Sequence, residues 1–142
     1  MQVFTVGYGG RKPADFLTLL QSAGVVTVAD VRLRPDRASL GCYTLTRKPD
    51  TGIVALLGSV GIGYISLPEL GNLYLDRDDS LARYARFFER SADLLVDRLL
   101  SVPGPIALLC AEKKVAECHR RTIADYLATL GHPITHLDGG EA

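Results

Sequence analysis

The chain has 142 residues, of which 47% are hydrophobic and 23% are charged. A chain of this length and composition usually folds around one core, so we expect a single ordered domain over residues 1–142. Sixteen basic and sixteen acidic residues give a formal net charge of zero. This balance argues against a nucleic-acid coat protein or a membrane-surface binder, because both carry an excess of one sign.

The sequence also bears on the compartment. No apolar run approaches the ~18 residues that a membrane-spanning helix needs, and the first residues lack the basic segment and cleavage site of a secretory signal. We therefore predict a cytoplasmic protein with no membrane partner. The three cysteines, an odd number, predict free thiols rather than a disulfide framework.

Strand and helix patterns alternate along the first part of the chain. The run 2–7 predicts a strand, and 13–23 predicts a helix that ends before Gly24, a residue typical of that position. The β-branched run 25–31 predicts a second strand. The segment 32–50 is rich in basic residues and has no regular pattern, so we expect a loop there with at most a short helix.

The alternation continues to the end of the chain. In order, the patterns predict a helix at 52–60, a strand at 63–67, a long helix after the N-cap candidates Asp79 and Ser80, a strand at 106–110, a helix at 118–130 and a strand at 133–137. The apolar stripe of the long helix is predicted to be Leu81, Tyr84, Phe88, Leu95 and Leu99. The run at 106–110 is continuously apolar, as is typical of the centre of a parallel sheet.

Strands that alternate with helices at this spacing predict an α/β fold. We expect a three-layer α/β/α sandwich with a mainly parallel, roughly five-stranded sheet, as in Rossmann-like proteins. Right-handed crossovers place helices on both faces of such a sheet. Ligands bind outside the carboxyl ends of its strands, so we expect the functional residues where the strands end.

Two strand ends carry residues suited to an anion. Gly7 and Tyr8 follow the first strand in a glycine-rich segment whose backbone could approach a phosphate, although a plain tight turn also needs glycine. Asp30 and Arg32 follow the second strand two positions apart, which puts both side chains on one side of an extended chain. The arginine would then grip a substrate oxyanion, or the pair would only anchor the following loop.

The densest chemistry follows the fourth predicted strand. Cys110 and Glu112 end that strand, and Cys118, His119 and Arg120 open the next predicted helix. A thiol at a helix start beside basic residues is favoured as a thiolate. The same helix start with Arg120 is a candidate anion site, and Glu112 is a candidate general acid or base.

Three interpretations of these residues stay open. A cysteine acts as nucleophile or redox centre; Cys110, Cys118 and His119, with Glu112, bind a metal; or Cys118 is a buried structural residue. The C-x7-C-H spacing fits no standard zinc pattern, and Ala116 stands where the phosphate loop of a cysteine phosphatase has an arginine. We therefore assign no metal ligand and no cofactor.

Several segments together carry a resemblance to a known family. They are Thr5-Val6-Gly7-Tyr8-Gly9, Asp30-Val31-Arg32 followed by Pro35, Gly61-Ile62-Gly63-Tyr64 leading to Leu67-Pro68-Glu69-Leu70-Gly71, Leu109-Cys110-Ala111-Glu112, and Cys118-His119-Arg120 with Ile123-Ala124-Asp125. In this order, over nearly the whole chain, they resemble the bacterial and archaeal family known as domain of unknown function 488. That family usually has histidine and serine where this chain has Tyr8 and Gly9.

The resemblance implies an α/β sandwich and one shared pocket. The pocket residues it implies are Asp30, Arg32, Glu69, Cys110, Glu112, Cys118, His119 and Arg120. It implies no particular reaction.

Taken together, the sequence predicts a small cytoplasmic enzyme that acts on a phosphate-bearing or other anionic substrate, such as a nucleotide or nucleic acid. Arg32 and Arg120 would hold the anion, Glu112 or Glu69 would move protons, and a cysteine would be the reactive group. One alternative is a non-catalytic module that binds a nucleotide or anion as a sensor. Another is a metal-dependent enzyme with Cys, His and Glu ligands.

Overall fold

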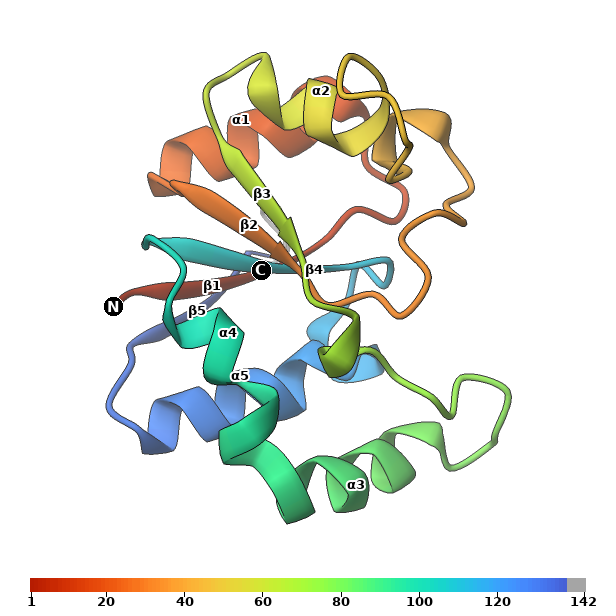
Figure 1. Ribbon diagram of the computed structural model, residues 1–142, viewed down its shortest axis with the longest axis vertical. Coiled ribbons are helices and arrows are strands. Elements are labelled where there is room, and N and C mark those ends of the chain that lie inside the picture. The colour runs from red at the N-terminus through yellow and green to blue at the C-terminus, as the bar shows by residue number, and fades with distance from the viewer. Residues whose placement is uncertain (138–142) are drawn as a thin grey trace.

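A parallel sheet in the strand order β3-β2-β4-β1-β5 forms the middle layer of the computed structural model (Figure 1). The structure describes residues 1–137, so residues 138–142 of the expected domain lie outside it. The strands are β1 (Val3–Gly7), β2 (Thr27–Asp30), β3 (Gly63–Ser66), β4 (Ile106–Cys110) and β5 (Ile134–Leu137). The predicted parallel sheet is confirmed, and the strand bounds differ from the expected ones by at most two residues.

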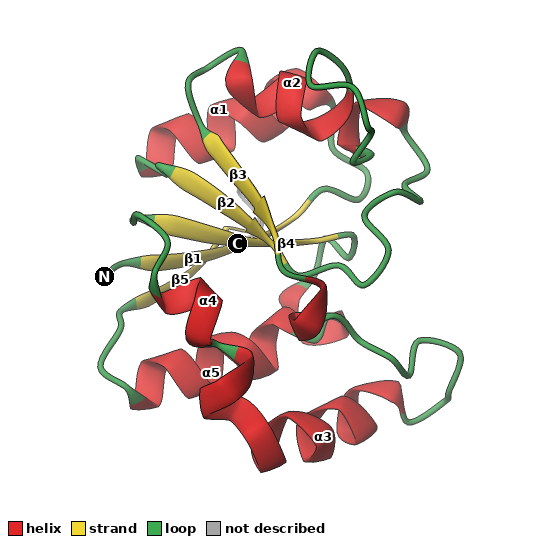
Figure 2. Cartoon of the chain, in the orientation of Figure 1, coloured by secondary structure: helices red, strands yellow, loops and turns green. Residues whose placement is uncertain are grey.

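Helices cover both faces of the sheet (Figure 2). They are α1 (Pro13–Ala23), α2 (Gly52–Gly58), α3 (Ser80–Leu95), α4 (Asp97–Leu100) and α5 (Arg120–Thr129), with 3₁₀ turns at η1 (Gly41–Tyr43), η2 (Pro68–Leu70) and η3 (Val115–Glu117). Helices α1 and α2 lie on one face, and α3, α4 and α5 lie on the other. The predicted three-layer architecture is therefore confirmed. Within residues 1–137, no helix combines the length and hydropathy that crossing a bilayer requires.

Helix α1 shows how local sequence sets the outer layers. Pro13 occupies its first turn, where the missing N–H costs nothing. Phe16 and Leu20, one turn apart, are both fully buried against the sheet. Gly24 ends the helix with a φ of 77°, in the left-handed region that favours glycine, and its N–H donates to the carbonyls of the last turn.

The long helix predicted after Ser80 is interrupted. Ser91 has φ −142° and ψ 27°, which kinks α3, and α4 follows as a separate short helix. The buried residues of this segment are Tyr84, Phe88, Ala92, Val96 and Leu99. The predicted stripe was therefore wrong in part, since Leu81 is exposed and Leu95 only partly buried. The kink changes the helical phase, so a stripe extended at constant period selects the wrong face.

Helix α5 begins later than predicted. The expected helix 118–130 starts at Arg120, because η3 precedes it and Cys118 has an extended backbone, with φ −129° and ψ 141°. Cys118 therefore sits just before the helix rather than in its first turn. The backbone N–H of Arg120, the first residue of α5, donates to its sulfur.

The connections after β1 and β4 approach each other closely at the carboxyl edge. The backbone N–H groups of Tyr8 and Gly9 donate to the carbonyls of Cys110 and Ala111 at 3.1 and 2.8 Å. A Cβ atom on Gly7 would overlap the backbone carbonyl of Glu112. Gly7 is thus required because another backbone passes beside it.

We expect Gly7→Ala to lower the free energy of unfolding by roughly 3 kcal/mol, because the added methyl group meets backbone that cannot rotate away. Gly58→Ala is the matched control. Gly58 is exposed near the end of α2 and has open space around its Cβ position, so alanine should stabilise the helix by about 0.5 kcal/mol. Denaturant unfolding of both variants measures the difference, and equal stabilities would contradict the close approach.

Candidate functional site

A cleft of about 180 Å³ opens at the carboxyl edge of the sheet. It lies where the strand connections diverge: those after β1 and β2 lead to helices on one face, and the one after β4 leads to α5 on the other. Ligands bind at such switch points in open α/β sheets. The predicted site residues that line it are Tyr8, Arg32, Cys110, Glu112, Cys118 and His119.

Asp30 and Arg32 form a buried ion pair at the end of β2. Arg32 donates from Nε to Oδ1 at 2.9 Å and from Nη2 to Oδ2 at 2.7 Å, and its backbone N–H also donates to Oδ1. The Tyr64 hydroxyl donates to Oδ2 at 2.5 Å. Asp30 is fully buried and Arg32 is 7% exposed. The expected pairing is confirmed, and Asp30 lies behind the arginine rather than on the cleft wall.

One hydrogen-bond donor of Arg32, its Nη1 atom, is not used by Asp30. Nη1 is buried and has no hydrogen-bond partner among residues 1–137. The guanidinium lies over the Tyr8 ring, 5.2 Å from its centroid. Burial lowers the pKa of Arg32, but the hydrogen bonds and charge of Asp30, with a smaller contribution from the Tyr8 hydroxyl, outweigh it and raise the pKa. The Tyr8 hydroxyl is therefore close enough to the guanidinium to affect its pKa, but no hydrogen bond of standard geometry satisfies Nη1.

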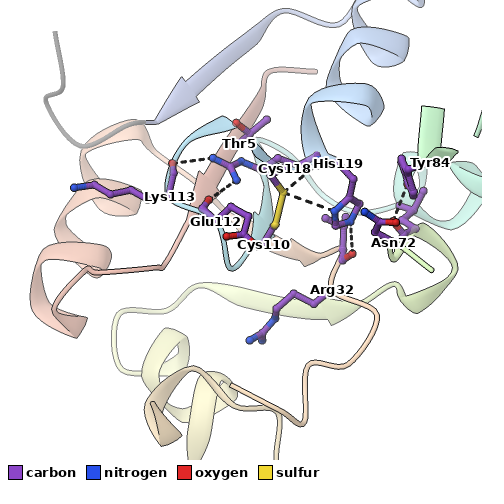
Figure 3. Close-up of a disulfide and its surroundings, with 12 residues drawn as sticks. Thr5, Arg32, Asn72, Tyr84, Cys110, Glu112, Lys113, Cys118 and His119 are labelled. Carbon is purple, nitrogen blue, oxygen red and sulfur yellow. Dashed lines mark hydrogen bonds between the residues drawn. A yellow bond between two sulfur atoms is a disulfide. The ribbon is translucent and has the colours of Figure 1, made fainter. Parts of the chain in front are cut away.

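The two cysteines of the cleft form a disulfide. Cys110 at the end of β4 is bonded to Cys118 before α5, and only 4% and 3% of these residues are exposed. Cys42 is unpaired and lies outside the cleft lining. The prediction of free thiols was therefore wrong for two of the three cysteines, because the fold brings together two residues that are separated by a polar loop in the sequence. Figure 3 shows the disulfide between the start of α5 and Arg32.

Cys118 has the more polar surroundings of the bonded pair. The backbone N–H of Arg120, at the start of α5, donates to its Sγ at 3.4 Å. The Nδ1 atom of His119 lies 3.7 Å from the same sulfur (Figure 3). A backbone donor at a helix start and an adjacent imidazole both favour a thiolate when the disulfide is reduced.

The hydrogen bonds of His119 indicate its tautomer. Its Nε2 lies 2.8 Å from the carbonyl oxygen of Val31. Because a carbonyl only accepts, Nε2 carries the proton and the neutral ring leaves a lone pair on Nδ1, toward Cys118. Burial lowers the pKa of His119, and the charge of Arg120 lowers it further, while the carbonyls of Val31 and Leu70 oppose the shift. The imidazole is thus a neutral acceptor at pH 7.

Three predicted site residues have other roles in the structure. Gly7 meets the backbone of Glu112 instead of facing the cleft. Arg120 is fully buried and donates to the carbonyls of Glu112 and Lys113 at 2.6 and 3.1 Å, so it shapes the connection after β4. Glu69 forms a bidentate ion pair with Arg98, and this pair lowers the pKa of the Glu69 carboxyl. None of the three is part of the cleft lining, which corrects their expected placement.

The cleft lining also includes residues that the sequence did not predict as part of the site. The polar ones are Arg34, Arg37, Asn72, Ser80 and Glu117. The basic character of the loop 32–50 was a signal for the two arginines, but nothing in the sequence pointed to Asn72 or Ser80. They reach the edge because the segment after β3 crosses to the face that carries α3.

Cys110, Cys118 and His119 also form a group that could hold a metal ion. Their potential ligand atoms lie within 4.8 Å of one another. With the disulfide formed, however, neither sulfur is the thiolate that a metal requires. The arrangement fits sulfur chemistry more directly than metal binding.

The fold and the cleft define a three-layer α/β protein whose polar site lies at a switch point of a parallel sheet. A family model described as domain of unknown function DUF488 matches residues 12–127. The chain belongs to this family, as the sequence segments indicated, although the match begins after the first strand. Comparisons with curated proteins and with solved structures returned no match.

We expect Asp30→Asn to lower the free energy of unfolding by roughly 3 to 5 kcal/mol, because it leaves the buried Arg32 charge without its partner. Asp36→Asn is the matched control: Asp36 and Arg34 have the same spacing but are about half exposed. Its unfolding curve should coincide with that of the unaltered protein. Similar losses in both variants would contradict a special role for the buried pair.

The lowered pKa of His119 predicts a pH dependence of stability. As pH falls below about 6.5, the histidine of the unfolded chain binds a proton before the buried one does, so stability falls. His119→Gln should flatten the unfolding free energy between pH 6.5 and 5, by up to about 1.4 kcal/mol per pH unit. His132→Gln keeps His119 and should retain the original slope. Equal slopes in both variants would contradict the assignment.

Proposed function

We propose that the protein is an enzyme that binds an anionic substrate in the carboxyl-edge cleft and uses Cys118 as its reactive group. The observation that carries the proposal is the spare Nη1 donor of Arg32, buried on a residue that lines the same cleft as the sulfur pair. A buried donor without a partner costs free energy. An oxyanion at Nη1 would remove that cost.

The charge pattern of the lining supports an anion of limited size. Arg34 and Arg37 join Arg32 on the cleft, against Glu112 and Glu117. The volume is below the roughly 300 to 1,000 Å³ typical of sites for drug-sized ligands. The proposal therefore favours a small anion, or a single charged group of a nucleotide, over a long nucleic-acid segment.

The chemistry is assigned to the side of the cleft near α5. In the dithiol state, Cys118 has the Arg120 N–H to stabilise a thiolate and His119 Nδ1 to accept its proton. Glu112 lines the cleft from an exposed position and is the candidate to return a proton to a leaving group. A non-catalytic sensor would use the same anion contacts without needing a nucleophile and a base in contact.

Titration with inorganic phosphate and with succinate, at constant ionic strength, tests anion binding. The side-chain Nε–H signal of Arg32 in NMR spectra should shift and saturate with at least one anion. In Asp30→Asn/Arg32→Gln, which removes both charges of the buried pair and the Arg32 signal itself, affinity is followed by the backbone amide signals of the cleft lining and should fall by about tenfold or more. The exposed pair on α5 provides a matched control, Asp125→Asn/Arg121→Gln, which should bind as the unaltered protein does. Binding unaffected by loss of Arg32, or no binding of either anion, would overturn the proposal.

A further inference from the structure

We propose that the reaction is thiol–disulfide exchange with small disulfides that carry an anionic group, in which Cys118 attacks and Cys110 resolves. This inference rests on the proposed function and adds its reaction and substrate class. It begins from a feature that anion binding does not explain: a second cysteine held within bonding reach of the reactive one.

The two cysteines lie at either end of the connection between β4 and α5. Cys110 ends the central strand β4, whose residues are all buried. Cys118 follows eight positions later in the sequence, just before α5. Both cysteines line the cleft. The fold thus accommodates the disulfide without disturbing the strand pairing of β4 or the start of α5. For a cytoplasmic chain, as the sequence predicts, a disulfide is more often transient and catalytic than structural.

The contacts distinguish the two cysteines. The Arg120 N–H and His119 Nδ1 both face Cys118. In thiol–disulfide exchange, the attacking sulfur must be a thiolate, and the resolving sulfur must reach the attacking one. Cys118 meets the first condition by its surroundings, and Cys110 meets the second by its position.

The exchange balances in two steps. In the first step, His119 Nδ1 takes the Cys118 proton and Cys118 Sγ attacks one substrate sulfur. A protein–substrate S–S bond forms as the substrate S–S bond breaks. The first thiolate leaves with the bonding pair and takes the proton from His119. Cys110 then attacks Cys118 Sγ, the Cys110–Cys118 bond forms, and the second thiolate leaves and takes the Cys110 proton. One disulfide becomes two thiols while the protein dithiol is oxidised. A low-molecular-weight dithiol, or two thiols, restores the reduced protein.

Arg32 sets the substrate class. Its side chain reaches along the edge on the other side of the disulfide from α5 (Figure 3), and its spare Nη1 suits a carboxylate or other oxyanion. A small disulfide with a carboxylate on each short substituent would present a sulfur to Cys118 while one carboxylate reaches Arg32. The small cleft volume favours such short substituents.

A charge series of small disulfides tests the inference in a Cys42→Ser background, which removes the unpaired thiol. The protein is reduced, separated from reductant and mixed with dithiodiglycolate, hydroxyethyl disulfide or cystamine, which are anionic, neutral and cationic. Loss of protein thiols gives the rates, and intact mass gives the products. The rate with dithiodiglycolate relative to the neutral disulfide should fall about tenfold in Asp30→Asn/Arg32→Gln and stay unchanged in Asp125→Asn/Arg121→Gln.

Cysteine variants test the order of attack. Cys110→Ser should stop at a stable adduct of one substrate half on Cys118, with one thiol released. Cys118→Ser should react more slowly, at the rate of an ordinary buried thiol. If the double variant of the buried pair is poorly folded, Arg32→Lys repeats the measurement, because lysine keeps a charge for Asp30 and loses the Nη1 donor.

The outcomes separate this inference from the proposed function. If succinate or phosphate binds at Arg32 but the dithiol is not oxidised to the Cys110–Cys118 disulfide, exchange is wrong and the anion site stands. If exchange proceeds with no dependence on substrate charge, the substrate class is wrong. An adduct that accumulates on Cys110 in preference to Cys118 would overturn the assigned order.

Discussion

The position of β4 between β1 and β2 is the constraint on which the site depends. Connections from β1 and β2 lead to one face of the sheet, whereas the one after β4 leads to the other. The backbones therefore diverge beyond the strand ends, and a cleft opens between them. The same arrangement presses the connection after β4 against Gly7, so the edge that forms the cleft is also closely packed.

A buried charge pair gives this edge its chemical character. Desolvating Asp30 and Arg32 is costly, and the pair is stable because three hydrogen bonds from the guanidinium, one from the backbone and one from Tyr64 satisfy the carboxylate. The carboxylate is fully engaged, but the guanidinium retains Nη1. The asymmetry explains why the pair can bind an anion and still support the fold.

The sulfur pair occupies the other wall of the cleft. Arg120 supports it in two ways, since its guanidinium holds the connection after β4 by two carbonyls while its backbone N–H faces Cys118. His119 is fixed by the carbonyl of Val31, the residue that follows β2. The residue that precedes α5 is thus oriented by the backbone next to Asp30, which links the anion-binding side of the cleft to the reactive side.

The sequence by itself determined the parallel α/β class, the strand positions and the Asp30–Arg32 pair, because periodicity and two-residue spacing act over short range. It also indicated Cys110, Glu112, Cys118 and His119 as residues of one site. Only the tertiary structure decided the strand order, the disulfide and the diversion of Arg120 and Glu69 to other partners. These depend on contacts between segments far apart in the chain, and composition, periodicity and spacing carry no information about which of several buried or charged residues will meet.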